Sequence, residues 1–291
     1  MIDEKRRIDG IQGLRFLAAL LVFLYHLQLP LEAAGRGDSV FTFFSNGGLG
    51  VDIFFVISGF IMVYTTCRRP GFAFPRFMMN RALRVFPPYW GVLLCTLAVT
   101  AAATLAGVET RTAEMVDARS LAVSVLLLPV PDHVMPVAWT LAAELVFYLI
   151  FAVGFALGRL RGVVVGLVLW YAAAVWYRDV VAEDLGLWIL LHSIVLEFLF
   201  GVAIGWLAVR GATPLGVPAL ALGMAGCLWS LQLDPGASSL PREFESGIPA
   251  ALLVYGTVAT RMTVHRWIVV GGEASYMLYL VHTLAMSIVT Q

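Results

Sequence analysis

Charged residues are scarce in this sequence. Only 13% of its 291 residues are Asp, Glu, Lys or Arg, whereas 60% are hydrophobic, and the mean hydropathy is +0.87. A soluble domain carries about a quarter charged residues, so the composition excludes an ordinary soluble protein and indicates a polytopic membrane protein. The formal net charge is zero, so the chain lacks the basic surplus expected of a nucleic-acid-binding protein.

Cysteine is also rare. Cys67, Cys95 and Cys227 lie far apart, a spacing that argues against a disulfide framework and a cysteine-based metal cluster. The sequence contains no Walker loop, no dinucleotide-binding fingerprint and no His/Cys set with zinc spacing, so we expect no metal cofactor. The start MIDEKRR resembles the basic region of a signal peptide. No small-residue cleavage site follows it, and we expect the first apolar run to be retained.

Long apolar runs make up most of the chain. Runs of about 17–25 such residues cross a bilayer as helices, and nine candidate spans occur: 11–31, 48–66, 82–107, 138–158, 163–178, 186–208, 216–233, 247–260 and 269–290. The shorter run 119–130 is expected to lie at the interface or to re-enter. The predicted fold is therefore all-α, a polytopic transmembrane helix bundle that forms a single domain over residues 1–291.

The basic residues orient this bundle. Most Lys and Arg fall on one side of the nine spans, and five arginines fall on the other: Arg36, Arg111, Arg119, Arg178 and Arg242. Since basic residues concentrate in cytoplasmic loops, the N-terminus is predicted to be cytoplasmic. The three longest loops, 32–47, 108–136 and 234–247, then lie on the outer face, and an odd number of spans leaves Gln291 outside.

A small set of ionisable residues lies inside the predicted spans: Arg15, Asp52, Glu144, Glu197, Glu273, His26, His192 and His282. A charged side chain costs about 2.5–3.5 kcal/mol at the centre of a span on insertion scales, so a functional role is the first hypothesis. The alternative is an ion pair or hydrogen bond between helices, which is less expected of residues that gather at one depth.

His26, Asp52 and Glu144 form such a group. A rise of 1.5 Å per residue places them about 8, 6 and 9 Å below the outer surface of a hydrocarbon core of about 30 Å. We therefore expect an acid–base centre beneath the long outer loops. Arg15 shares a face of the first span with His26, about 20° away and about 16 Å along the axis. That alignment is expected for a ligand that passes lengthwise through the bundle.

A second cluster occurs in RFMMNRALRVFPPYW, residues 76–90. Arg81 and Arg84 are spaced i, i+3 on the predicted first turn of a helix, where two guanidinium groups and the helix N-terminus favour phosphate. The alternative is an ordinary basic flank on the cytoplasmic side. Pro87 and Pro88 are expected to kink the helix and to move Tyr89 off its straight path.

Two further stripes are more typical of helix contacts than of chemistry. In the sixth span Glu197 shares a face with Gly201 and Gly205, which predicts close helix packing and a structural role. The last span carries a polar stripe of the kind that hydrogen-bonds neighbouring helices: Ser275, Tyr279 and His282.

These polar residues lie in five ordered segments: IDGIQGLRFLAALLVFLYH (8–26), GLGVDIFFVISGF (48–60), RALRVFPPYW (81–90), WTLAAELVFYLIF (139–151) and ASYMLYLVH (274–282). Together they resemble the signatures of the acyltransferase 3 family, integral-membrane O-acyltransferases that modify bacterial surface and exported glycans. The resemblance covers nearly the whole chain. Thr140 stands where the family usually has serine. The family commonly has a tenth span, so the sequence is expected to be a truncated or a minimal member.

The resemblance implies a reaction and a location. It implies an acyl-CoA donor, commonly acetyl-CoA, bound from the cytoplasm, and an acceptor hydroxyl on a polysaccharide, a lipid-linked glycan or an exported metabolite. It also implies the bacterial inner membrane. His26 would be the essential histidine with Arg15 in the same catalytic set, and Arg81, Arg84 and Tyr89 would bind the donor. Other positions match the motifs without a defined role: Asp52, Ser58, Trp139, Glu144, Tyr148, Ser275, Tyr279 and His282.

More than one mechanism fits these residues. On the favoured hypothesis His26 deprotonates the acceptor hydroxyl, Asp52 or Glu144 orients the imidazole, and Arg15 stabilises negative charge. A two-step route through an acyl-enzyme uses the same residues. Two alternative functions belong to other classes of protein. A transporter or flippase would show inverted repeats and broken helices, and the chain could otherwise be a non-catalytic subunit of a glycan-export complex.

Overall fold

The computed structural model describes residues 2–33, 44, 46–69, 71–108, 110–177, 187–233 and 240–289. Every regular element within these residues is helical and none is a strand, so the predicted all-α class is confirmed. Arg36 and Arg178, which the sequence placed in outer loops, lie outside the described residues.

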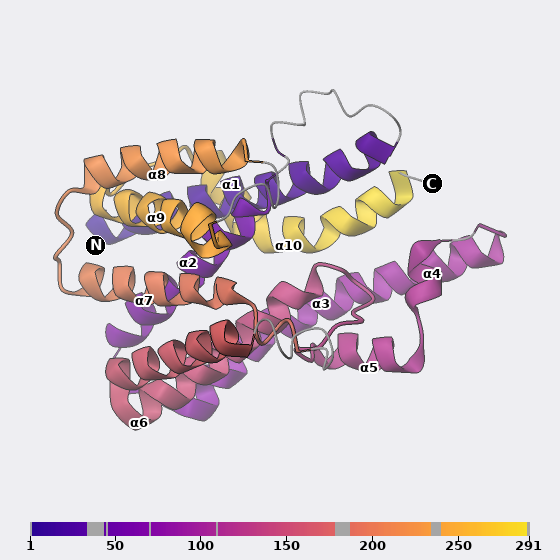
Figure 1. Ribbon diagram of the computed structural model, residues 1–291, viewed down its shortest axis with the longest axis horizontal. Coiled ribbons are helices and arrows are strands. Elements are labelled where there is room, and N and C mark those ends of the chain that lie inside the picture. The colour runs from indigo at the N-terminus through magenta and orange to yellow at the C-terminus, as the bar shows by residue number, and fades with distance from the viewer. Residues whose placement is uncertain are drawn as a thin grey trace. The chain divides into compact units, whose positions relative to one another are not determined.

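The described helices follow one another in the order shown in Figure 1. They are α1 (Ile2–Ala33), α2 (Leu49–Cys67), α3 (Phe74–Leu105), α4 (Arg111–Met115), α5 (Ala118–Leu126), α6 (Ala138–Tyr177), α7 (Leu196–Val209), α8 (Gly216–Leu231), α9 (Ile248–Thr260) and α10 (Arg266–Val289). A 3₁₀ turn, η2 (Ser193–Val195), precedes α7, and a π-helical turn, η3 (Glu243–Gly247), precedes α9.

Each of the nine predicted apolar runs overlaps a helix. Among the described helices five are long and apolar enough to cross a membrane, namely α1, α2, α3, α6 and α10, whereas α7 and α8 are apolar but shorter. These helices indicate a multi-pass membrane protein. The total of nine spans and the cytoplasmic N-terminus remain predictions.

The fourth and fifth predicted spans are the two arms of α6. The backbone leaves helical geometry at Gly158 (φ −140°) and at Arg159 (φ 55°), which are the last residue of the run 138–158 and the first residue of the interval before the run 163–178. A Cβ added to Gly154 would lie 2.7 Å from the carbonyl carbon of Gly162. The arms therefore fold back against each other at a glycine contact, which is how small residues let membrane helices approach closely.

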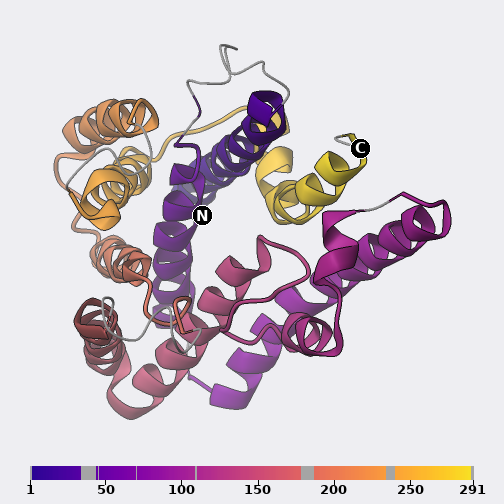
Figure 2. The same cartoon turned by 45° about the vertical axis from the view of Figure 1, so that its right-hand side comes forward.

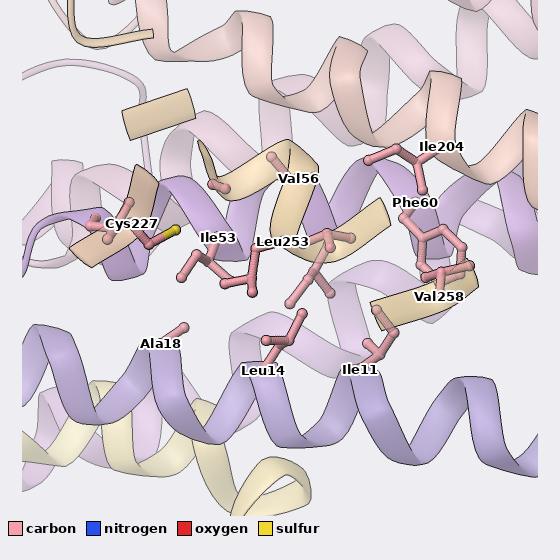
Figure 3. Close-up of a cluster of buried hydrophobic side chains, with 14 of the residues drawn as sticks. Ile11, Leu14, Ala18, Ile53, Val56, Phe60, Ile204, Cys227, Leu253 and Val258 are labelled. Carbon is pink, nitrogen blue, oxygen red and sulfur yellow. The ribbon is translucent and has the colours of Figure 1, made fainter. Parts of the chain in front are cut away.

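The chain divides into two compact units. The first comprises Met1–Gly71 and Ser193–Tyr279, and thus α1, α2, α7, α8, α9 and most of α10. Its core is apolar: Figure 3 shows Ile11, Leu14 and Ala18 of α1 directed toward side chains such as Ile53 and Leu253. These contacts join α1, α2 and α9 around one cluster.

Glycines set the helix spacing in this unit. Helices α8 and α9 lie side by side in Figure 1 and Figure 2, and a Cβ on Gly223 of α8 would meet the backbone of Leu253 in α9. A Cβ on Gly201 of α7 would meet the carbonyl oxygen of Val56 in α2, and one on Gly205 would lie 2.8 Å from the Cβ of Val63. The predicted close packing at Gly201 and Gly205 is confirmed.

The second unit comprises Phe72–His192 and Leu280–Gln291. Aromatic rings join α3 and the segment just before it to the first arm of α6: the centroids of Phe77 in α3 and Phe151 are 5.5 Å apart, and those of Phe72, two residues before α3, and Phe155 are 4.9 Å apart. Helix α3 begins at Phe74, after the extended Ala73 and with Pro75 in its first turn. It continues without interruption through Pro87 and Pro88.

One expectation about α3 was wrong. Arg81 and Arg84 lie on the second and third turns and not on the first, because the helix starts at Phe74. A proline in the first turn is compatible with a helix since its missing N–H has no partner there. The amide dipoles of a helix N-terminus act within the first turn, so they do not add to the two guanidinium groups.

Residues 119–126 of the run 119–130 belong to the short helix α5, whose nine residues are too few to cross a bilayer. Its N-terminus carries a capping box: the Ser120 amide donates to Asp117 Oδ1 at 2.6 Å, and Ser120 Oγ accepts from the Asp117 amide at 2.9 Å. The hydrogen bond from Ser120 lowers the pKa of Asp117. This accounts for the sharp start of α5.

Candidate active site

Asp52 is the best-defined charged residue of the first unit. Its side chain is fully buried in α2, and both carboxylate oxygens accept hydrogen bonds from Arg242, Oδ1 from Nε at 3.1 Å and Oδ2 from Nη2 at 2.6 Å. Arg242 Nη2 also donates to the carbonyl oxygen of Gly48 at 2.9 Å, one turn before Asp52. The ion pair with Asp52 raises the pKa of Arg242. Bidentate geometry of this kind is among the strongest that a carboxylate forms.

Further polar groups surround this pair. Glu197, in the first turn of α7, is fully buried and interacts electrostatically with Asp52. Neither of its carboxylate oxygens has a hydrogen bond of standard geometry among the described residues. Ser193 Oγ donates to Glu243 Oε2 at 2.8 Å. The cluster therefore joins α2, α7 and the two short turns.

The sequence did not single out Arg242, which it placed among the outer-loop arginines. The available signal was an imbalance of charge inside the spans, where four carboxylates were set against Arg15 alone. A buried carboxylate requires a partner, so the surplus required a cation from outside the spans. The sequence alone could not identify this cation as Arg242, because it lies 190 residues from Asp52 along the chain.

His26 lies near the end of α1, and its ring is half-buried. Nδ1 is 2.8 Å from the carbonyl oxygen of Val22. Because a carbonyl only accepts, Nδ1 carries the proton in this hydrogen bond, and the basic lone pair resides on Nε2.

Glycines bring this end of α1 to the start of α2. A Cβ on Gly47 would lie 2.8 Å from the Cβ of Tyr25, the residue before His26. One on Gly50 would lie 2.8 Å from Val22 Cγ2 and would meet the carbonyl oxygen of Ala18. The structure thus places His26 and Asp52 at the same end of the α1–α2 pair, while the carboxylate of Asp52 is bound by Arg242.

Arg15 lies further along α1, where Nη1 donates to Gln12 Oε1 at 3.2 Å. Helix α10 approaches α1 there, since a Cβ on Gly271 would lie 2.7 Å from Phe16 Cδ2. The polar stripe of α10 begins one turn later with Ser275, whose buried hydroxyl has no hydrogen bond among the described residues. Its next member, Tyr279, has its ring centroid 5.9 Å from that of Phe54 in α2.

The remaining motif positions are placed without a role. His282 is buried, just under one turn beyond Tyr279 on α10. Ser58 is half-buried on α2, between Asp52 and the cytoplasm-proximal end predicted for that helix. Glu273 is exposed on α10. Ser58 and His282 are predicted motif positions without a defined role, and Glu273 lies outside the motif segments.

The second unit holds a different charged cluster, between α3 and α6. Tyr148 donates its hydroxyl hydrogen to Glu144 Oε1 at 2.6 Å, and the Arg81 guanidinium carbon lies 5.7 Å from the centroid of the Tyr148 ring. Arg81 interacts electrostatically with Glu144 and with the exposed Arg84. The sequence predicted that Asp52 or Glu144 orients His26 and that Arg81 and Arg84 bind the donor. The structure instead brings Glu144, Arg81 and Arg84 together around Tyr148.

This cluster has a surplus of positive charge. Two guanidinium groups face one carboxylate, and the buried Nε of Arg81 has no hydrogen-bond partner among the described residues. An unsatisfied buried donor costs about 1–3 kcal/mol. The arrangement therefore retains capacity for an anionic ligand, and paired arginines suit phosphate.

Tyr89 and Trp139 lie in packed surroundings. Tyr89 is fully buried, with its hydroxyl close to Ser124 of α5, and the neighbouring Trp90 donates from Nε1 to the carbonyl oxygen of Val125 at 2.9 Å. Trp139 stacks on the ring of His192 with centroids 5.6 Å apart. Tyr89 thus holds α5 against α3, and its predicted part in donor binding stays a prediction.

No group of three or more His, Cys, Asp and Glu side chains that could hold a metal ion is found in the part of the chain that the structure describes. The described charged clusters and the end of α1 offer an imidazole, several carboxylates and guanidinium groups. These suit proton transfer and the binding of anions.

Comparison with known proteins decides the family. The family model described as an acyltransferase domain, that of acyltransferase 3, matches residues 8–291. The chain belongs to the acyltransferase 3 family. It is also similar to the exopolysaccharide production protein ExoZ of Rhizobium meliloti (strain 1021), with 35% identity over 263 residues that cover 85% of this chain and 79% of ExoZ. No solved structure matches the chain.

As a member of this family the protein is an O-acyltransferase. The acyltransferase 3 match begins at Ile8 and so includes Arg15, His26 and both charged clusters. Each compact unit contributes one cluster, Asp52 with Arg242 in the first and Arg81 with Glu144 in the second.

Proposed function

We propose that this protein transfers an acyl group, acetyl in the first instance, from acyl-CoA to a hydroxyl group of an exopolysaccharide or of its lipid-linked precursor. The membership in the acyltransferase 3 family supports the reaction, and the name of the relative ExoZ supports the acceptor class. We further propose that the enzyme lies in the bacterial inner membrane with nine spans and takes its donor from the cytoplasm.

The hydrogen bond from His26 Nδ1 to the Val22 carbonyl is the observation that carries the mechanism. With the proton held on Nδ1, Nε2 accepts the proton of the acceptor hydroxyl. The alkoxide oxygen then attacks the thioester carbonyl carbon, forming the C–O bond. The C–S bond breaks, and the leaving thiolate takes the proton back from the imidazolium to give the free thiol.

The charged groups have separate parts in this proposal. Arg15, on the same helix as His26, stabilises negative charge that develops on the thioester oxygen. Arg81 and Arg84 bind phosphate groups of the donor, which the surplus positive charge of their cluster supports. Asp52 belongs to the end of the α1–α2 pair that carries His26. Glu144 acts on the arginines, since it interacts electrostatically with Arg81 and accepts a hydrogen bond from Tyr148.

The decisive experiment is an acyl-transfer assay. Membranes that contain the protein and its acceptor glycan receive acetyl-CoA with a labelled acetyl group, and the label in isolated glycan is measured. Wild-type membranes are expected to label the glycan, and His26→Ala membranes to lose at least about 99% of the label, since general base catalysis contributes about 10²–10⁴-fold. His265→Ala, which changes an exposed histidine in the same unit, is the matched control.

The other functions predict different results. A flippase would move glycan across the membrane and leave it unlabelled. A non-catalytic subunit would leave labelling intact in His26→Ala membranes. Label that accumulates on the protein in the absence of glycan, and disappears in His26→Ala, would select the two-step route over direct attack.

A further inference from the structure

We propose that Arg242 is a positioning residue for acyl transfer, which fixes Asp52 and the first turn of α2 and through them the turn of α1 that carries His26. This inference rests on the proposed function. Arg242 belongs to none of the five motif segments, and its importance follows from three hydrogen bonds that one guanidinium group makes.

Those three bonds clamp a single helical turn. Arg242 Nε and Nη2 bind the two oxygens of Asp52, and Nη2 also binds the carbonyl oxygen of Gly48, the residue that precedes α2. The planar fork of arginine reaches both carboxylate oxygens at once, whereas a lysine ammonium is a point donor. The clamp therefore fixes the rotation of the turn as well as its position.

The clamped turn is in direct contact with the helix of the proposed base. Gly47 and Gly50 pack against Tyr25 and Val22 of α1 so closely that a Cβ on either glycine would lie 2.8 Å from those side chains. Val22 is also the residue whose carbonyl oxygen accepts the Nδ1 hydrogen of His26. A shift of the Gly47–Asp52 turn is thus passed to the residue that orients the imidazole.

Arg242 is itself held by its neighbours along the chain. It immediately precedes the π-helical turn η3, an irregularity that is frequent at functional sites. Within η3, Glu243 accepts from Ser193 at 2.8 Å, and the hydroxyl groups of Ser246 and Ser230 are 2.8 Å apart. These bonds tie η3 to η2 and to α8, so the clamp has a fixed base.

The charges around Arg242 make a test possible. Arg242 faces Asp52 directly and Glu197 electrostatically. Removing the guanidinium alone leaves two buried carboxyl groups without their cation, which is costly. Removing the charge of Asp52 at the same time relieves that cost without restoring the clamp. In the double variant the effect of the clamp on the Tm can therefore be distinguished from its effect on kcat.

The experiment compares Arg242→Gln, Arg242→Lys and the double variant Asp52→Asn/Arg242→Gln in the membrane assay and in thermal unfolding of the purified full chain. Arg242→Gln is expected to lower the Tm by about 5–15 °C and kcat by about 30- to 100-fold, with the KM for acetyl-CoA within about twofold of wild type. The double variant is expected to recover most of the Tm but less than a tenth of the kcat. Arg242→Lys should fall between wild type and Arg242→Gln in kcat.

Two results would overturn the inference. One is wild-type kcat in Arg242→Gln. The other is wild-type kcat in the double variant, which would show that Arg242 only stabilises the fold. Arg210→Gln, an exposed arginine of the same unit, is the matched control and should leave both readouts unchanged. If wild-type membranes label no glycan, the proposed function fails, whereas the order of Tm values still tests the clamp.

Discussion

The charged clusters of the two compact units have opposite imbalances of charge. In the first, two buried carboxyl groups, Asp52 and Glu197, share one guanidinium group, and Asp52 binds it through both oxygens. In the second, two arginines share one carboxylate, that of Glu144, which is already hydrogen-bonded to Tyr148. In the first cluster Arg242 binds both oxygens of Asp52, whereas neither carboxylate oxygen of Glu197 has a hydrogen bond of standard geometry among the described residues. The second cluster keeps a buried donor, Arg81 Nε, that has no hydrogen-bond partner in the described part of the chain.

This difference separates positioning from binding. A bidentate ion pair with a third bond to the backbone fixes geometry, but it leaves few donors for a ligand. A cluster with surplus positive charge and an unsatisfied donor gains free energy when an anion binds. We therefore assign conformational control of the α1–α2 pair to the first cluster and donor binding to the second.

The largest expected effect comes from removing both arginines of the second cluster. Arg81→Gln/Arg84→Gln should raise the KM for acetyl-CoA by about 100-fold, because hydrogen bonds to charged groups contribute about 1.5–3 kcal/mol each, with kcat at saturating donor within about threefold of wild type. Initial rates of glycan labelling at varied acetyl-CoA concentration measure both. Arg76→Gln, an exposed arginine on the same helix, is the control. An unchanged KM in the double variant would contradict donor binding at this cluster.

A smaller effect distinguishes two roles that Glu144 could have in the reaction. If Glu144 competes with donor phosphates for the arginines, Glu144→Gln should lower the KM for acetyl-CoA by about two- to fivefold, the size of a partly exposed ion pair. If it orients His26, kcat should fall and KM should not change. We expect the first result. Tyr148→Phe removes the hydroxyl that binds Glu144 and should shift KM in the same direction by less.

The smallest effect concerns the first cluster. Glu197→Gln should raise the Tm by about 2–4 °C, because an amide always donates to Asp52, whereas a carboxyl group donates only when it is protonated and repels Asp52 when it is ionised; the gain is about 1 kcal/mol. Asp52→Ala should lower the Tm, since Arg242 loses both of its acceptor oxygens. Thermal unfolding of the full chain in one detergent compares the two. A lower Tm in Glu197→Gln would show that the Glu197 carboxyl group already donates a hydrogen bond to Asp52 that the amide does not replace.

Hydropathy predicted much of the fold because it responds to local composition. All nine apolar runs overlap helices, and the interval between two of them begins at the break at Gly158 and Arg159. The start of α3 was missed for the same reason: the helix extends beyond its apolar part to Phe74. Hydropathy detects the segment suited to lipid, whereas the helix end depends on backbone geometry and on Pro75.

Glycine spacing was the second reliable signal. Gly201 and Gly205 share a helix face by sequence alone, and both meet α2. A helix face follows from the period of 3.6 residues, so no knowledge of the partner helix is needed to predict that such a face packs closely.

The sequence by itself determined the all-α class, the family and the set of ionisable residues that the membrane helices carry, because each depends on residue type and on spacing within one segment. Only the tertiary structure decided the partners from other segments: Arg242 for Asp52 across 190 residues, and Arg81 of α3 for Glu144 of α6. Burial requires that a charge be paired, but it does not say by which residue. That choice depends on which helix faces meet, and these are set by contacts between segments far apart in the chain.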